Sequence, residues 1–384
     1  MAAAAPHARI GAMARFPLST MSNLIDVSVR YDLAESTCPA LRVDEIIDPA
    51  ELAALTLGYG TSPGDADLRA LVAADTGVRP EQVLVTTGAA GAMALLALDR
   101  SPGRVLVVGP CFPPASTVPA GLGAEVDVVS GRFDDGYRLP VDAVADRLTD
   151  TTRLVSLASP QNPAGVRYTD DELAALLAAV TERAAPDAIV LVDETYRAST
   201  YGATPVPPSA ATLSPRVVTC SSLSKAHGAP GLRLGWLTCT DPEPYERLRN
   251  AKFVTALSSA RIDEVLGAAV LRRQRELLAP RAALLTRTLA TLSSWVDTMP
   301  VDLVRPDGGA LCCVRLSPER IPDGAVPAFY ARLAELDTRV EPGGTFGEAD
   351  RVFRLGFGNL PEADFAEALS RLGDAVRAAT TAAA

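Results

Sequence analysis

The chain has 384 residues, of which 48% are hydrophobic and 21% are charged, and its formal net charge at pH 7 is −10. This length predicts two domains, each with its own core. The acidic charge argues against a nucleic-acid partner, which would need a basic surface, and no apolar run is long enough to span a membrane.

The six cysteines show no CxxC spacing and the chain has only two histidines. We therefore expect neither a metal site nor a disulfide framework. The alanine-rich start, residues 1–15, lacks the basic region and unbroken apolar core of a signal peptide. Together these features predict a reduced, cytoplasmic protein.

Short apolar runs alternate with helical segments between residues 80 and 236. The runs are apolar on both sides, which is typical of a parallel sheet buried under helices. The alternation predicts an α/β fold. The predicted strands are residues 82–86, 105–108, 154–158, 189–192 and 217–220.

Three helical segments are predicted with different signals. Residues 89–99 directly follow a strand, and residues 173–180 follow a capping box between Thr169 and Glu172. A longer segment, residues 262–295, should break at Pro280 and join the large domain to a smaller C-terminal one.

A lysine among small hydroxyl residues follows the strand 217–220. Residues 221–236 read Ser-Ser-Leu-Ser-Lys-Ala-His-Gly-Ala-Pro-Gly-Leu-Arg-Leu-Gly-Trp, with Ser222 three positions before Lys225 and Arg233 eight positions after it. A lysine nucleophile must be neutral and therefore needs a partly desolvated pocket, while a guanidinium with a hydroxyl binds phosphate well. An exposed lysine in an ordinary loop is the alternative.

Polar or turn-forming residues also end the other predicted strands. Gly88, Ala89 and Ala90 join a strand to a helix, whose first backbone N–H groups can bind phosphate. Asn162 lies in an Asn-Pro turn, and Asp193 ends an apolar run where an unpaired charge would be costly. Ligand sites in open α/β sheets form at such strand ends.

The ordered set of these residues resembles the fold-type I pyridoxal-phosphate enzymes of the class I/II aminotransferase superfamily. The resemblance implies an enzyme with pyridoxal 5′-phosphate bound to Lys225 and with Lys225, Asp193 and Tyr196 as catalytic residues. The implied cofactor-binding set is Gly88, Ala89, Ala90, Phe112, Asn162, Asp193, Tyr196, Ser222, Lys225, Arg233 and Tyr59.

Individual roles follow from the same resemblance. Phe112 would stack on the pyridine ring, and Asn162 and Tyr196 would bind the phenolic oxygen. Asp193 would pair with the pyridine nitrogen. In the implied homodimer, Tyr59 would reach the phosphate in the neighbouring subunit.

The resemblance also implies the architecture and the substrate clamp. A mostly parallel seven-stranded sheet would form a large domain of residues 46–280. Residues 1–45 and 281–384 would form a smaller α+β domain, with the N-terminal segment over the active site. Arg354 would bind the substrate α-carboxylate through a planar, bidentate contact, and Arg351 is expected to face solvent.

The segment from Tyr31 to Cys38 resembles a narrower branch, the capreomycidine synthases of antibiotic biosynthesis, which cyclise 3-hydroxyarginine. This implies β-elimination followed by addition of the guanidino group, with Glu35 or Asp32 binding that group. Both acids could equally be solvated surface residues. The alternative function is an aminotransferase that transfers an amino group from an L-amino acid to a 2-keto acid.

Overall fold

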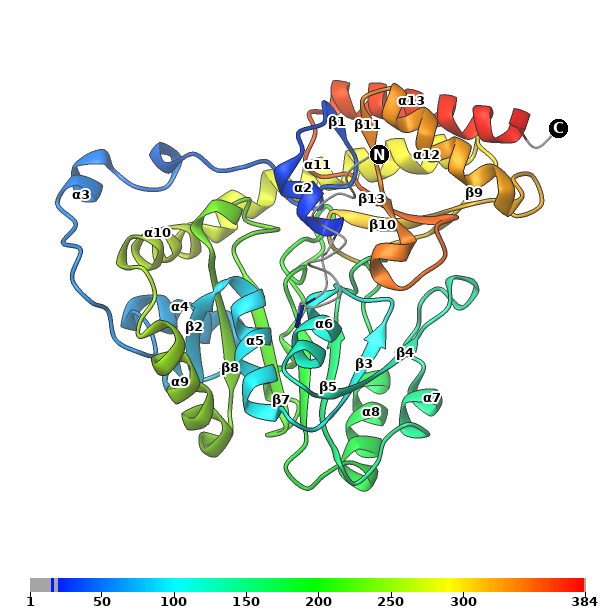
Figure 1. Ribbon diagram of the computed structural model, residues 1–384. Coiled ribbons are helices and arrows are strands. Elements are labelled where there is room, and N and C mark those ends of the chain that lie inside the picture. The colour runs from blue at the N-terminus through cyan, green and yellow to red at the C-terminus, as the bar shows by residue number, and fades with distance from the viewer. Residues whose placement is uncertain (1–14, 17–19, 383–384) are drawn as a thin grey trace, which may run out of the picture.

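The computed structural model describes residues 15–16 and 20–382, and Figure 1 shows their arrangement. Within these residues the strands form sheets of seven, four and two strands. Most of the alanine-rich start, which was not expected to be a signal peptide, lies outside the described residues.

The seven-stranded sheet has the order β2-β8-β7-β6-β5-β3-β4. All its neighbouring strands are parallel except β8, which runs antiparallel to both β2 and β7. The predicted mostly parallel seven-stranded sheet is therefore confirmed. Its strands are β2 (Val83–Thr87), β3 (Arg104–Gly109), β4 (Glu125–Ser130), β5 (Thr152–Ala158), β6 (Ile189–Asp193), β7 (Val217–Ser222) and β8 (Leu234–Cys239).

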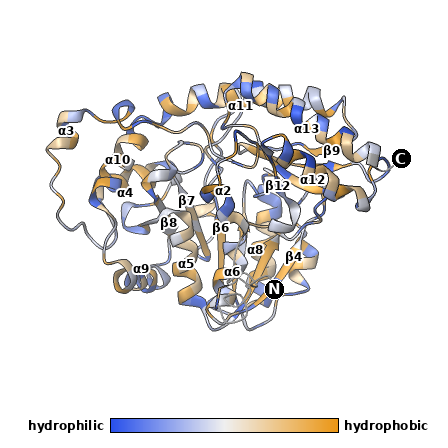
Figure 2. Ribbon diagram, turned by 45° about the horizontal axis from the view of Figure 1, so that its top comes forward, coloured by the Kyte–Doolittle hydropathy of each residue, from blue (hydrophilic) through white to orange (hydrophobic). Residues whose placement is uncertain are grey.

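Helices cover both faces of this sheet, whose strands are mainly hydrophobic (Figure 2). Because side chains alternate along a strand, Leu106 packs on one face with α7 and α8, whereas Val105 packs on the other with α5 and α9. The helices around the sheet are α4 (Ala66–Thr76), α5 (Gly88–Arg100), α6 (Pro114–Gly121), α7 (Val141–Ala145), α8 (Asp170–Arg183), α9 (Pro242–Ala256) and α10 (Arg261–Arg272).

The helix ends test two predictions. The capping box is confirmed, because the Glu172 backbone N–H donates to Thr169 Oγ1 and the Thr169 N–H donates to the Glu172 carboxylate. The predicted break at Pro280 is wrong, because α10 ends before Arg273 and α11 (Gln274–Val296) runs through the proline. Pro280 is exposed while Leu277 on the same helix is buried, so packing of the inner face holds the helix across one missing hydrogen bond.

The four-stranded antiparallel sheet has the order β12-β13-β10-β9 and packs against α11, α12 and α13. The N-terminal β1 (Tyr31–Asp32) pairs with β11 (Thr338–Arg339) near this sheet. The remaining elements here are β9 (Val301–Val304), β10 (Leu311–Leu316), α12 (Val326–Glu335), β12 (Glu341–Pro342), β13 (Val352–Gly356) and α13 (Glu362–Ala382). The helix α11 spans residue 280, the expected boundary between the two domains. The division into a large domain of residues 46–280 and a smaller one of residues 1–45 and 281–384 remains a proposal.

Between β1 and α4 the chain leaves the body and returns, as Figure 1 shows on the left. This outlying arm contains α3 (Pro49–Ala53), whereas the short helix α2 (Asn23–Asp26) precedes β1. We call residues 31–41, which run along the interface of the two larger sheets, the strap. Its backbone bonds to Arg339 and Gly356 on one side and to Lys225 and Gly228 on the other.

Candidate active site

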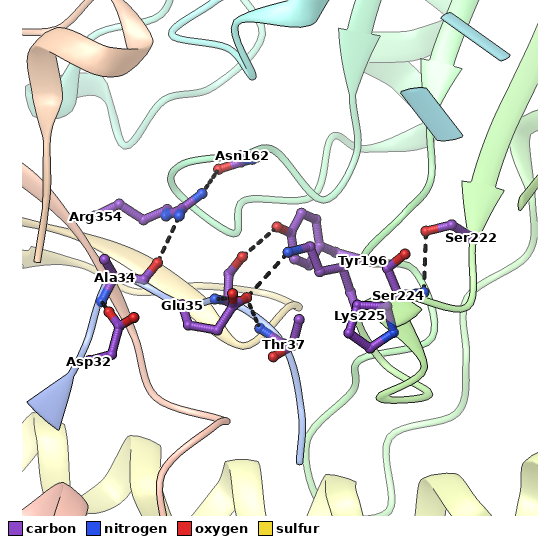
Figure 3. A network of polar contacts seen from close by, with 12 residues as sticks. Asp32, Ala34, Glu35, Thr37, Asn162, Tyr196, Ser222, Ser224, Lys225 and Arg354 are labelled. Atoms are coloured by element: carbon purple, nitrogen blue, oxygen red, sulfur yellow. Dashed lines mark hydrogen bonds and ion pairs between the residues drawn. The ribbon is translucent and has the colours of Figure 1, made fainter. Parts of the chain in front are cut away.

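The lysine loop begins where β7 ends. Lys225 lies three residues after Ser222, and its Nζ is 3.4 Å from Oε1 of Glu35 on the strap. Both side chains are about one quarter exposed, at 25% and 26%. The sequence-predicted lysine and one predicted acid therefore meet in a partly desolvated place (Figure 3).

The turn at Gly88 forms a cradle for an anion. Gly88 begins α5 with a φ of +66°, and a Cβ there would lie 2.8 Å from Nη2 of Arg233. Arg233 Nη1 is also 3.5 Å from Oγ of Ser224. A guanidinium thus lies against the N-terminus of a helix, where backbone N–H groups favour negative charge.

The remaining residues near this turn contribute less side-chain chemistry. Ala89 and Ala90 bring only backbone N–H groups, as expected from the sequence. Ser222 is buried, with its Oγ 3.4 Å from the backbone nitrogen of Ser224. Gly235 on β8 lets the strand pass close to the turn, since a Cβ there would overlap the Gly88 backbone.

Asp193 ends β6 and is buried. Its Oδ1 accepts hydrogen bonds from Thr195 Oγ1 at 2.6 Å and from the Thr195 backbone N–H at 3.0 Å. Burial raises the pKa of Asp193 despite these bonds and the nearby charge of Lys225. Among the described residues no cationic side chain lies within ion-pair distance of it, so this carboxylate fits a cationic partner on a ligand.

Arg354 on β13 lies on the other side of the site, with only 2% of its surface exposed. Its Nη1 donates to Asn162 Oδ1 at 3.0 Å and its Nη2 donates to the Ala34 carbonyl at 2.7 Å. The guanidinium lies over the Phe346 ring at 4.9 Å, and its Nε has no partner among the described residues. A buried guanidinium bonded to neutral oxygens is suited to a carboxylate ligand.

Glu35 is held by its own strap. Its Oε1 accepts from the backbone N–H groups of Ser36 at 2.7 Å and Thr37 at 2.9 Å. Burial raises the pKa of Glu35, but the charges of Lys225 and Arg354 and these backbone bonds outweigh it and lower the net pKa. Within the described part of the chain, Oε2 accepts no hydrogen bond.

Asp32, the other predicted acid, is not brought to the lysine. It forms an ion pair with Arg339 across the β1–β11 pairing, and its Oδ1 also accepts from the Ala34 N–H at 2.9 Å. Glu35 is therefore the candidate that the geometry favours.

Two aromatic residues of the predicted cofactor site are Tyr196, near the lysine loop, and Phe112, just after the end of β3. Tyr196 is buried and its hydroxyl is 2.9 Å from Ser36 Oγ. Phe112 is half-buried and packs against the hydrophobic core between the large sheet and α5, which includes Leu191. Tyr59 lies on the outlying arm and is 91% exposed, so it contributes nothing to the site of its own chain.

Three site features were missed by the sequence reasoning. Ser36 and Phe346 contact Tyr196 and Arg354, and Glu341 lies opposite Arg354 in the β12–β13 pairing. Burial raises the pKa of Glu341 despite a bond from Thr345 Oγ1. No local motif marks these residues, because contacts between segments distant in sequence bring them here.

The donor set fits pyridoxal phosphate. The Gly88 turn and Arg233 form a cradle for a phosphate. Asp193 is a buried carboxylate without a cationic partner among the described residues. Lys225 supplies a partly exposed amine. A phosphate requires the first of these groups, a protonated pyridine nitrogen the second, and an aldehyde an amine that can be neutral.

Comparison with known proteins places this arrangement in a family. The sequence profile of "Aminotransferase class I and II" matches residues 29–372, and the chain belongs to that family. It is accordingly a pyridoxal-phosphate-dependent enzyme of fold type I, as the sequence predicted.

Three relatives show the range of activities among similar proteins. Capreomycidine synthase of Streptomyces vinaceus is 29% identical over 85% of this chain and 84% of its own length. An arginine–pyruvate transaminase of Pseudomonas aeruginosa is 30% identical over 67% of this chain and 65% of its own. The crystal structure of the pyridoxal-phosphate-dependent cyclase OrfR superposes with a TM-score of 0.80 at 28% identity, covering 92% of this chain and 94% of the other.

No helix within the described ranges combines the length and apolar character needed to cross a membrane. Cytoplasmic localisation remains a prediction.

Proposed function

We propose that the enzyme cyclises a β-hydroxylated arginine such as 3-hydroxyarginine. The observation that carries this proposal is Glu35, a carboxylate with one free oxygen beside Lys225. The similarity to capreomycidine synthase over most of the chain supports the same assignment. The reaction would belong to secondary metabolism, such as antibiotic biosynthesis.

Arg354 binds the substrate α-carboxylate. In the structure its guanidinium donates to the oxygens of Asn162 and Ala34, which are neutral acceptors. A carboxylate is a stronger acceptor with matching planar geometry, so it replaces one or both of these contacts. This fixes the substrate Cα relative to Lys225.

Glu35 binds the substrate guanidinium through Oε2. Its Oε1 is fixed by two backbone N–H groups and by Lys225, which leaves the second oxygen oriented and accessible. The lowered pKa keeps this carboxylate charged at neutral pH. A neutral side chain of the same shape would leave the charge unpaired, and the site rejects it.

Lys225 Nζ moves the Cα proton. Pyridoxal phosphate, when bound, withdraws electrons from Cα, and Asp193 maintains the positive charge on the pyridine nitrogen that this requires. The substrate loses the Cα proton and the Cβ hydroxyl, which together make one water. A guanidino nitrogen then bonds to Cβ and gives up its proton, while Lys225 returns a proton to Cα, and this closes a six-membered ring. No second substrate is consumed.

The test is incubation with 3-hydroxyarginine in the absence of a keto acid, followed by mass spectrometry. The expected product is lighter than the substrate by one water and retains the amino group. Arginine with pyruvate is the comparison reaction. Release of a 2-keto product only when the keto acid is present would instead establish an aminotransferase.

That aminotransferase is the second candidate function. It is favoured by the similarity to an arginine–pyruvate transaminase, and the same Arg354 and Glu35 would bind arginine itself. The two candidates differ in whether the substrate carries a β-leaving group, so dependence on an added keto acid separates them.

We also propose that the active unit is a homodimer. Tyr59 and Leu57 on the arm are 91% and 77% exposed, and Phe253, Val254 and Leu257 at the end of α9 are also exposed. Such apolar exposure is typical of a surface covered by a second subunit. In the proposal, Tyr59 completes the neighbouring phosphate site.

Mixed dimers of Lys225→Ala and Tyr59→Phe chains test this arrangement. Each variant alone should have little activity, because one lacks its lysine and the other its phosphate contact. The mixture should recover activity, since a mixed dimer contains one site with both residues intact. A fully active monomer in sedimentation, or no recovery on mixing, would rule the proposal out.

A further inference from the structure

A serine on the strap contacts the phenol at the end of β6. Ser36 Oγ is 2.9 Å from the hydroxyl oxygen of Tyr196, and the two side chains are only 1% and 4% exposed. Figure 3 shows Tyr196 beside the contact between Glu35 and Lys225. Two neighbouring strap residues therefore contact Tyr196 and Lys225.

The position of Ser36 is fixed from several directions. Its own N–H and that of Thr37 donate to Glu35, and the Cys38 N–H donates to the Lys225 carbonyl at 3.1 Å. On the other side of the strap, Leu33 accepts from the Gly356 N–H at 2.6 Å. The serine hydroxyl is thus presented by a backbone anchored to both sheets.

We propose that Ser36 is a positioning residue that donates its proton to the Tyr196 hydroxyl and so directs the single proton of Tyr196 toward the bound cofactor. This rests on the proposed place of Tyr196 in the cofactor site, and it does not depend on which reaction follows. A phenol has one proton to donate and can accept from another hydroxyl at the same time. Among the described residues, Ser36 is the one hydrogen-bond partner of that phenol.

The donated hydrogen bond makes Tyr196 a stronger donor, because hydrogen bonds in a chain polarise one another. Loss of the serine hydroxyl would leave more negative charge on the cofactor phenolic oxygen. That charge holds the neighbouring proton at the cofactor–lysine nitrogen more tightly. The apparent pKa of that nitrogen, read from the change in the cofactor's visible absorbance with pH, should therefore rise.

The experiment is a spectroscopic titration of the loaded enzyme without substrate. Ser36→Ala should raise the apparent pKa by about 0.5 pH unit, and Tyr196→Phe should raise it further. Ser36→Cys, which keeps the size but donates weakly, should behave like Ser36→Ala. Thr37→Val is the matched control on the same strap and should leave the titration unchanged.

The double variant Ser36→Ala/Tyr196→Phe separates the proposed relay from a general disturbance of the strap. In the Tyr196→Phe background, Ser36→Ala should cause no further shift. An unchanged pKa in Ser36→Ala, or an equal shift in both backgrounds, would overturn the proposal. If Tyr196→Phe alone shifts nothing, Tyr196 does not contact the cofactor and the relay is also excluded, while the keto-acid test of the reaction stays independent.

Discussion

Substitution of Glu35 by glutamine tests the origin of substrate selection. The change keeps the shape of the side chain and removes its charge. Glu35 is about one quarter exposed and already bonded through Oε1, so the lost interaction is one charge-assisted hydrogen bond, worth about 1.5 to 3 kcal/mol. Converted to rates, this is a loss of about 10- to 150-fold in kcat/KM for a guanidinium substrate.

The assay compares 3-hydroxyarginine with 3-hydroxycitrulline, which has a neutral ureido group of similar shape. Glu35→Gln should lower kcat/KM for the cationic substrate selectively and reduce the ratio between the two. Any effect through Lys225 is common to both substrates and cancels in that ratio. Glu45→Gln, the same change at an exposed acid of the outlying arm, is the control. An unchanged ratio in Glu35→Gln would refute the proposed guanidinium contact.

Further predictions concern the lysine, the buried carboxylate and the buried histidine. Lys225→Ala should bind the cofactor without a borohydride-fixable link, and a reduced pyridoxyl group on another lysine, such as the buried Lys252, would contradict the assignment. Asp193→Asn should fold but lose about 100-fold or more of its turnover, and near-normal turnover would count against an ion pair with the ring. Burial lowers the pKa of His227 from 6.5 to about 4. On acidification His227 is therefore protonated in the unfolded chain before it is protonated in the folded chain, and the free energy of unfolding falls as pH drops from about 6.5 towards 4. Between pH 7.5 and 5 the wild type should lose about 2 kcal/mol more unfolding free energy than His227→Gln in urea titrations, and equal losses would exclude this effect.

The sequence predicted five strands of the large sheet and the polar residues at their ends, but it did not mark β8, which is buried along its whole length. It did not mark β4 as a strand, because its Glu125 and Asp127 alternate with valines at a sheet edge and no continuous apolar run results. The sequence also predicted a helix break at Pro280, but α11 continues through this residue. Arg351, expected to face solvent, instead pairs with Asp323 and donates to the Leu316 carbonyl at 3.0 Å.

Site residues supplied by distant pairings had no local signal. Ser36 is one hydroxyl in a short polar stretch, and its role follows only from the strap lying between Lys225 and β13. The choice between Glu35 and Asp32 likewise depended on Arg339, which belongs to β11. Spacing along the chain cannot reveal which of two nearby acids a distant strand neutralises.

The same strand sets both ends of the candidate substrate site. Arg354 lies on β13, and two residues later the Gly356 N–H bonds to Leu33 of the strap at 2.6 Å. A Cβ at Gly356 would overlap the Glu35 carbonyl oxygen, so the close approach of strand and strap requires glycine. The separation between the Arg354 guanidinium and the Glu35 carboxylate is therefore fixed by backbone packing. In the proposed function, a site with its two charges held in this way would select its substrate by the length of the cationic side chain as well as by its charge.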